Sequence, residues 1–327
     1  MIISTFRNSQ PINLVFLFIA TLVLRLPALF FISPPILPLS EEPLGGFFIN
    51  LFSPLLINPF LNVLFTSLLV YLQAVMVNQL TKRYNILYKS TYLPGLLFVV
   101  FSSLFTTFLF LNTVLMVNFF VILLVGQLFS LYKSMISYQT VFNCGLIVST
   151  GALFYFPFLL VFPVIWVSLF VLRSFNWREW AISFVGLLVP ILFVWSYYFI
   201  INKLSVFSRL WMPLKTQFPV SLSIDFNDYL VLIPVLLVFL LSIYAWRQNF
   251  FKNVIQVRKS QEVLFVLPFF LGVSFYLKSN YTIMHLQLLS VPFSIFLAYY
   301  FISARKKWLY ESFFIIICGF IYFFQFN

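Results

Sequence analysis

Residues 113–132 read TVLMVNFFVILLVGQLFSLY, a run that contains no charged side chain and ends directly before Lys133. A helix needs about 20 mainly apolar residues to cross the hydrocarbon core of a bilayer, because every backbone N–H and C=O in the lipid must be hydrogen-bonded within the segment. The length and composition of this run therefore predict a transmembrane helix.

The rest of the chain has the same character. Of its 327 residues, 63% are hydrophobic and only 8% are charged, whereas charged residues make up about 25% of ordinary soluble domains. The mean hydropathy is +1.06, and a soluble globule cannot bury so much apolar surface. We therefore expect an integral membrane protein and exclude soluble enzymes, disordered tails and nucleic-acid-binding proteins.

Segments of this length recur along the chain. We predict an all-α, polytopic bundle of about eleven transmembrane helices, which forms a single integral membrane domain over residues 1–327. The segments 141–156 and 158–172 meet at Pro157, so a re-entrant hairpin is an alternative to two full spans there. The expected segments are 11–32, 60–80, 92–111, 113–132, 141–156, 158–172, 181–201, 228–246, 262–277, 281–302 and 308–325.

The lysines and arginines indicate how such a bundle crosses the membrane. The chain has 19 Lys and Arg against 7 Asp and Glu, which gives a net charge of +12. With the N-terminus in the cytoplasm and eleven spans, 14 of the 19 cations fall on the cytoplasmic side, as the positive-inside rule requires. We predict a cytoplasmic N-terminus and an outer C-terminus, with membrane lipid as a partner and no nucleic acid.

The two cysteines, Cys144 and Cys318, both lie in apolar runs. They form neither a disulfide framework nor the spacing of a metal site, and small buried side chains are the favoured interpretation. We expect no metal site and no cofactor. A divalent cation is the one group for which the chain offers ligands, namely the carboxylates of Glu41 and Glu42.

Two connections on the predicted outer side, about 33–59 and about 202–227, are longer than the others. Long loops on an otherwise tightly connected scaffold are candidate functional regions. The first loop contains an acidic pair and then a semi-apolar stretch interrupted by Pro54 and Pro59. This stretch predicts a helix in the membrane interface rather than one that crosses the membrane.

The acidic pair, Glu41 and Glu42, has two interpretations. Either carboxylate is able to act as a general base, or the pair belongs to a solvated loop that keeps this segment outside. His285 is the only histidine and lies near the outer end of the predicted span 281–302. Its imidazole can exchange a proton close to the interface, or it can join two helices by hydrogen bonds.

Five cations share this predicted outer face with His285. They are Arg25, Lys203, Arg209, Lys215 and Lys278. Arg25 lies within a predicted span, where an arginine either snorkels outward or meets an anion. A face that combines cations with a carboxylate is chemically suited to hold a phosphate and remove a proton. We therefore assign lipid-phosphate or substrate binding to Arg25, Lys203, Arg209 and Lys278 and to His285.

Several short runs resemble one protein family over nearly the whole chain. They are Met1–Asn13, Tyr92–Pro94, Leu153–Pro157, Arg173–Phe175 and Arg178–Trp180. In these runs the chain is similar to an uncharacterised family of polytopic inner-membrane proteins of Bacteroidota, which implies the bacterial cytoplasmic (inner) membrane and no established activity. Members often carry a carotene-monooxygenase label, but a single histidine cannot supply the several imidazoles of such an iron site.

A second resemblance is architectural. A cytoplasmic N-terminus, Arg25-Leu26-Pro27 at the end of the first span, an acidic first outer loop and a long loop at 202–227 are similar to GT-C glycosyltransferases. This resemblance implies transfer of a sugar from a polyprenyl phosphate at the outer face, with Glu41 or Glu42 as the catalytic acid or base. The cations that it assigns to the lipid-linked phosphate are Arg25, Lys203 or Arg209.

The sequence departs from the GT-C pattern at one place. The usual Asp-Glu pair followed closely by an aromatic residue is here Glu41-Glu42-Pro43-Leu44. A non-catalytic membrane subunit of an envelope assembly or secretion complex is therefore the alternative function, and it implies protein partners in place of a polyprenyl-phosphate-linked sugar.

Overall fold

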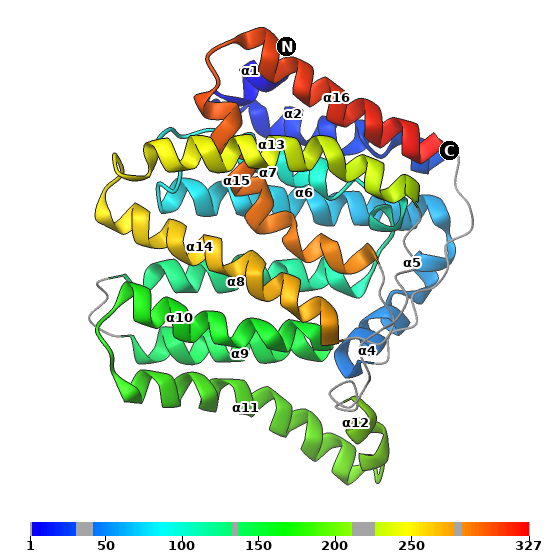
Figure 1. Cartoon of the computed structure of the whole chain (residues 1–327). Coiled ribbons are helices and arrows are strands. Elements are labelled where there is room, and N and C mark those ends of the chain that lie inside the picture. Colours follow the sequence, from blue (N-terminus) through cyan, green and yellow to red (C-terminus); the bar gives the residue numbers. More distant parts are fainter. Residues whose placement is uncertain (1, 31–41, 133–136, 211–225, 278–282, 327) are drawn as a thin grey trace.

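The computed structural model describes residues 2–30, 42–132, 137–210, 226–277 and 283–326, and in these residues every regular element is a helix (Figure 1). Most of the longer helices run side by side and form one bundle. The helices of the bundle are α2 (Asn13–Val23), α6 (Pro59–Arg83), α7 (Leu93–Phe101), α8 (Thr113–Ser130), α9 (Tyr138–Phe154), α10 (Phe162–Leu172), α11 (Trp177–Ile200), α13 (Phe226–Phe250), α14 (Ile255–Val273), α15 (Ser290–Ser303) and α16 (Lys307–Phe326). The short helices are α1 (Ile2–Phe6), α3 (Leu26–Phe30), α4 (Pro43–Leu51), α5 (Ser53–Ile57), α12 (Leu204–Leu210) and the 3-10 helices η1 (Thr106–Leu109), η2 (Phe156–Val161), η4 (Ser274–Leu277) and η5 (Ile283–Leu289).

Seven helical stretches within these described residues are long and apolar enough to cross a membrane. The chain is therefore an all-α, multi-pass membrane protein, as its composition predicts. The count of eleven spans and the sides on which the termini lie stay predictions. The seven stretches are Pro59–Arg83, Thr113–Ser130, Trp177–Ile200, Leu232–Phe250, Ile255–Leu277, Ile283–Ser303 and Lys307–Phe326, and the two shorter apolar helices are Asn13–Val23 and Phe156–Leu172.

Two expected spans are interrupted in the structure. In 11–32, α2 ends at Val23, because the ring of Pro27 would clash with the carbonyl of Val23 if the helix continued. In 92–111, α7 ends at Phe101 and the chain continues through Ser102 toward η1. The second interruption leaves backbone carbonyls inside the bundle, where a buried donor can bind them.

Helices α9 and α11 approach each other very closely. A Cβ atom added to Gly145 would lie 2.2 Å from the Ser183 carbonyl oxygen, and one added to Gly186 would lie 2.3 Å from the Phe142 carbonyl oxygen. Only glycine fits at these two positions. Small residues at such contacts are typical of helix packing in membranes, where van der Waals contact takes the place of the hydrophobic effect.

Helix α6 ends in a cap that shapes its connection to α7. Asn85 adopts a left-handed conformation with a φ of 48°. Its N–H donates to the Lys82 carbonyl (3.3 Å), and the Ile86 N–H donates to the Thr81 carbonyl (3.1 Å). This is a Schellman arrangement, which satisfies the last carbonyls of the helix. Ile86 is buried, and its carbonyl accepts a hydrogen bond of 2.6 Å from Tyr299 Oη in α15, which holds the connection against that helix.

The N-terminal segment is bound to the two C-terminal helices. The Arg7 guanidinium donates to the carbonyls of Phe301 (2.7 Å) and Ala304 (2.6 Å) at the end of α15. The Glu311 carboxylate in α16 accepts a hydrogen bond of 3.0 Å from the Ser4 N–H. Both contacts match the partial charges of helix ends. The Arg7 cation lies at the negative C-terminal end of α15, and the Glu311 carboxylate binds free N–H groups of α1 at its positive N-terminal end.

The short helices α4, α5 and α12 lie at one end of the bundle (Figure 1). The sequence predicts here a helix in the membrane interface that Pro54 and Pro59 interrupt. The structure shows helix boundaries at both prolines, and the position in the interface stays a prediction. Pro54 lies in the first turn of α5 and Pro59 in the first turn of α6, where the missing proline N–H costs no intrahelical hydrogen bond. Asn58 caps α6, since its Oδ1 accepts from the Phe60 N–H over 3.1 Å.

Candidate functional site

Glu42 is the member of the acidic pair that the structure describes, since Glu41 lies outside the described residues. Glu42 directly precedes α4, and only 6% of its surface is exposed. The Phe156 N–H, at the start of η2, donates to the carboxylate Oε1 over 3.5 Å. The burial of Glu42 contradicts the interpretation that places it on a solvated loop, because α4 turns the carboxylate inward against η2.

A small cavity of about 20 Å³ lies beside Glu42. Pro43 of α4, Ser149 of α9, Ile191 of α11 and Phe207 of α12 contribute to its wall. The buried Ser149 hydroxyl has no hydrogen-bond partner within the described part of the chain. Its wall is mainly apolar, and a cavity of this volume accommodates at most about one water molecule.

A tyrosine and the only histidine form a hydrogen-bonded pair next to Glu42. Tyr155 follows the last residue of α9, and its Oη lies 2.9 Å from Nδ1 of His285 in η5. Both side chains are buried. The Glu42 carboxylate accepts from the N–H of Phe156, the residue directly after Tyr155. A carboxylate, a phenol and an imidazole from three distant parts of the chain therefore lie in one region of the interior.

The partners of the second ring nitrogen assign the tautomer of His285. Nε2 lies 3.0 Å from the Leu271 carbonyl oxygen and 3.1 Å from Ser274 Oγ. Because a carbonyl oxygen only accepts, Nε2 carries a proton. In the neutral ring Nδ1 is then the acceptor, and the Tyr155 hydroxyl donates to it.

Together these three side chains, which we call the Glu42 cluster, are able to exchange protons. A carboxylate can take a proton from a hydroxyl group, and a hydrogen-bonded tyrosine–histidine pair can hold or pass one. Sequence reasoning singled out Glu42 and His285 but missed Tyr155. The available signal was its position directly before Phe156-Pro157, at the break between two apolar segments, where a polar atom can reach the end of the bundle.

Arg25 lies in the chain between α2 and α3, and its side chain has hydrogen-bond partners in the interior of the bundle. Its side chain is fully buried. The guanidinium donates to the carbonyls of Ser102 (2.9 Å), Phe108 (3.4 Å) and Leu109 (3.4 Å). Arg25 therefore does not snorkel toward the membrane surface, because the break after α7 provides acceptors inside the bundle. Its assignment to a lipid phosphate stays a prediction.

The three other cations to which we assign substrate binding are less completely described. Lys203 lies between α11 and α12 with an exposed side chain, and its N–H donates to the Tyr198 carbonyl over 2.9 Å. Arg209 belongs to α12, but its side chain lies outside the described residues, as does the whole of Lys278. The structure thus brings Glu42 and His285 together through Tyr155, and the roles assigned to the cations stay predictions.

Metal binding has no support from the part of the chain that the structure describes, in which no group of three or more His, Cys, Asp or Glu side chains is placed to hold a metal ion. Cys144 and Cys318 are both free thiols, the first buried and the second partly buried. A divalent cation at the acidic pair stays a prediction, since Glu41 is not described.

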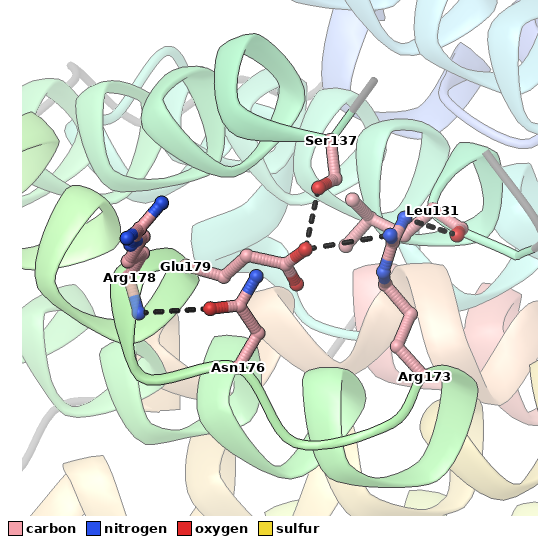
Figure 2. Close-up of polar contacts among 6 residues, drawn as sticks. All are labelled: Leu131, Ser137, Arg173, Asn176, Arg178 and Glu179. Atoms are coloured by element: carbon pink, nitrogen blue, oxygen red, sulfur yellow. Dashed lines mark hydrogen bonds and ion pairs between the residues drawn. The ribbon is translucent and has the colours of Figure 1, made fainter. Parts of the chain in front are cut away.

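A second polar cluster lies at the other end of α9 (Figure 2). Arg173 Nη2 lies 3.4 Å from Glu179 Oε1, and the Ser137 hydroxyl donates to the same oxygen over 2.5 Å. Arg173 also donates to the Leu131 carbonyl over 3.4 Å. These contacts connect the ends of α8, α9, α10 and α11, so the cluster fastens neighbouring helices where they leave the apolar interior.

The fold and the site define the class of this molecule as a multi-pass α-helical membrane protein with a buried glutamate, tyrosine and histidine. The chain belongs to DUF6427, a family of unknown function, whose model matches residues 43–327 and thus begins directly after Glu42. No curated protein and no solved structure matches the chain. This membership is consistent with the resemblance to an uncharacterised family and assigns no activity.

Proposed function

We propose that the protein is a GT-C-like glycosyltransferase, embedded in the bacterial cytoplasmic membrane, that transfers a sugar from a polyprenyl phosphate at the outer face. The observation that supports this proposal is the position of Glu42. It is a buried carboxylate in the connection that follows the first apolar helix, and it lies next to the Tyr155–His285 pair. The architectural resemblance implies a catalytic carboxylate in this connection, and the fold alone does not establish the activity.

In the proposed reaction Glu42 acts as the general base. Its carboxylate accepts the proton of an acceptor hydroxyl while the hydroxyl oxygen forms a bond to the anomeric carbon of the sugar. The bond between that carbon and the phosphate oxygen breaks, and its electron pair leaves with the polyprenyl phosphate. Tyr155 and His285 act as positioning residues, because their hydrogen bond holds the chain next to Phe156, whose N–H binds Glu42.

The proposed reaction requires the end of the bundle with α4 and α12 to face outward. Lys203 and Lys252 are both exposed and lie on opposite sides in the predicted threading. In a Cys144→Ala/Cys318→Ala background, a membrane-impermeant maleimide should label Lys203→Cys in intact spheroplasts and Lys252→Cys only after the membrane is opened. The reverse labelling pattern would contradict both the orientation and the outer-face reaction.

The catalytic step is tested with purified full-length protein and a panel of undecaprenyl phosphate-linked hexoses. Release of undecaprenyl phosphate is the readout, because every such transfer produces it. Glu42→Gln keeps the size of the side chain and removes the base, so we expect a loss of about 100-fold or more. The matched control is Glu262→Gln, which changes an exposed carboxylate in the first half of α14. Full activity of the Glu41→Gln/Glu42→Gln variant would overturn the catalytic proposal.

A non-catalytic membrane subunit of an envelope assembly or secretion complex is the second candidate. One observation favours it: the cavity beside Glu42, about 20 Å³ in volume, holds a water molecule but no sugar. This candidate predicts that affinity purification in mild detergent retrieves a protein partner in stoichiometric amounts. It also predicts that Glu42→Gln leaves the complex intact. Transfer activity that depends on Glu42 would exclude it.

A further inference from the structure

A second cavity lies at the opposite end of α6 from α5, where α6 ends and the chain turns toward α7. Its volume is about 230 Å³. The side chains of Asn78, Lys82, Ser90 and Thr91 contribute polar groups to its wall. It shares no lining residue with the cavity beside Glu42, so the proposed transfer reaction makes no use of it.

Two buried polar groups in this wall have no hydrogen-bond partner within the described residues, namely Thr91 Oγ1 and Asn78 Nδ2. Thr91 is 8% exposed and Asn78 is 4% exposed. The Gly95 N–H donates to Asn78 Oδ1 over 2.8 Å, which orients the amide and leaves its NH₂ group as a donor without an acceptor. Buried polar groups are rarely left unsatisfied in folded proteins. A ligand in the cavity that offers acceptor oxygens would satisfy the Thr91 hydroxyl.

The surroundings of the cavity are positively charged. Lys82 lines it and also lines a small adjoining cavity together with Lys89. No carboxylate is found in the walls of either cavity among the residues described. Tyr92 also lines the larger cavity and is the N-cap residue of α7, so the positive end of that helix dipole lies at this wall. The C-terminus of α6 carries the negative end of its helix dipole, but its last carbonyls already accept hydrogen bonds from the N–H groups of the cap.

We propose that this cavity binds a phosphate group, supplied either by an anionic lipid headgroup or by free phosphate. Phosphate oxygens accept hydrogen bonds from ammonium, hydroxyl and amide donors, and the wall provides all three. Leu14 of α2 and Val75 of α6 extend the wall with apolar surface, next to which the first part of a lipid chain can lie. Basic pockets at the ends of transmembrane helices are chemically suited to anionic headgroups.

Lipid binding is tested by native mass spectrometry of the full-length protein with phosphatidylglycerol and with phosphatidylcholine. We expect stronger binding of phosphatidylglycerol, and about tenfold weaker binding after Lys82→Gln or Thr91→Val, since each change removes a donor to a charged group. The matched control is Lys252→Gln, an exposed lysine in neither cavity wall. Thr91→Val is nearly isosteric and removes a hydroxyl without a described partner, so the thermal unfolding temperature in detergent should not fall.

The source of the phosphate is distinguished by a second arm with inorganic phosphate. A site for free phosphate is supported by two results together. Millimolar phosphate stabilises the parent and Lys252→Gln but not Lys82→Gln, and the parent shows no preference for phosphatidylglycerol. Preference for phosphatidylglycerol that is lost in the same variant supports a headgroup site. If Lys82→Gln and Thr91→Val bind both probes as the control does, or if neither probe binds, the proposal is overturned.

Discussion

Tyr155 and His285 are 130 positions apart in the chain, and their side chains share a hydrogen bond of 2.9 Å in the interior. Tyr155 stands at the end of α9, whereas His285 belongs to η5, which leads into α15. The bond therefore connects the middle of the chain to its C-terminal part at the end of the bundle where Glu42 lies.

Removal of this hydrogen bond should destabilise the protein. Tyr155→Phe leaves Nδ1 of His285 buried without its donor, so we expect the free energy of unfolding to fall by about 1–3 kcal/mol. The measurement is reversible unfolding of the purified protein in detergent. Tyr138→Phe, at an exposed position at the start of α9, is the control and should stay within about 0.5 kcal/mol of the parent. Equal effects of the two variants would contradict a structural role for the bond.

Arg25 should be more important for stability than any exposed cation. Arg25→Met removes the donors that satisfy the carbonyls of Ser102, Phe108 and Leu109. We expect a loss of about 2–4 kcal/mol, because these buried oxygens lose partners that carry a charge. Lys203→Met, at an exposed position, should change the free energy of unfolding little. A variant of Arg25 that is as stable as the parent would show that water or lipid replaces the guanidinium.

The contact between α9 and α11 should not tolerate a methyl group. Gly145→Ala and Gly186→Ala each place a Cβ less than about 2.5 Å from a carbonyl oxygen, and forcing the helices apart should cost about 1–3 kcal/mol. Gly272→Ala and Gly319→Ala provide the comparison, since an added Cβ meets nothing within 4 Å at either position. These two should be neutral or stabilising, by up to about 1 kcal/mol. Unfolding in detergent distinguishes the two pairs.

Arg173 and Glu179 should be energetically coupled. Their charged groups are 3.4 Å apart, and the side chain of Glu179 is only 4% exposed. A double-mutant cycle of Arg173→Met and Glu179→Gln should yield a coupling free energy of about 0.5–3 kcal/mol. Strictly additive losses would indicate that the Ser137 hydroxyl, which also binds Glu179, is the partner that matters.

Much of the candidate site was beyond the reach of sequence reasoning. Glu42 and His285 stood out as rare polar groups in an apolar chain, and their shared outer face followed from the predicted threading. Tyr155 did not stand out, because the chain contains 17 tyrosines and nothing in their spacing shows which of them faces a histidine. The inward position of Arg25 was equally hidden, since it depends on carbonyls released where α7 ends.

The sequence by itself determined the lipid surroundings and the helical class of this protein. Uncharged apolar runs such as 113–132 must lie in lipid, and in lipid the backbone must form helices. Prolines such as Pro27 and Pro59 also set where helices end or begin. Only the tertiary structure decided which polar groups meet, as Tyr155 and His285 do. The physical reason is that apolar helix faces are chemically alike in lipid, so the choice of neighbours rests on close backbone contacts and on the pairing of a few buried polar groups from distant parts of the chain.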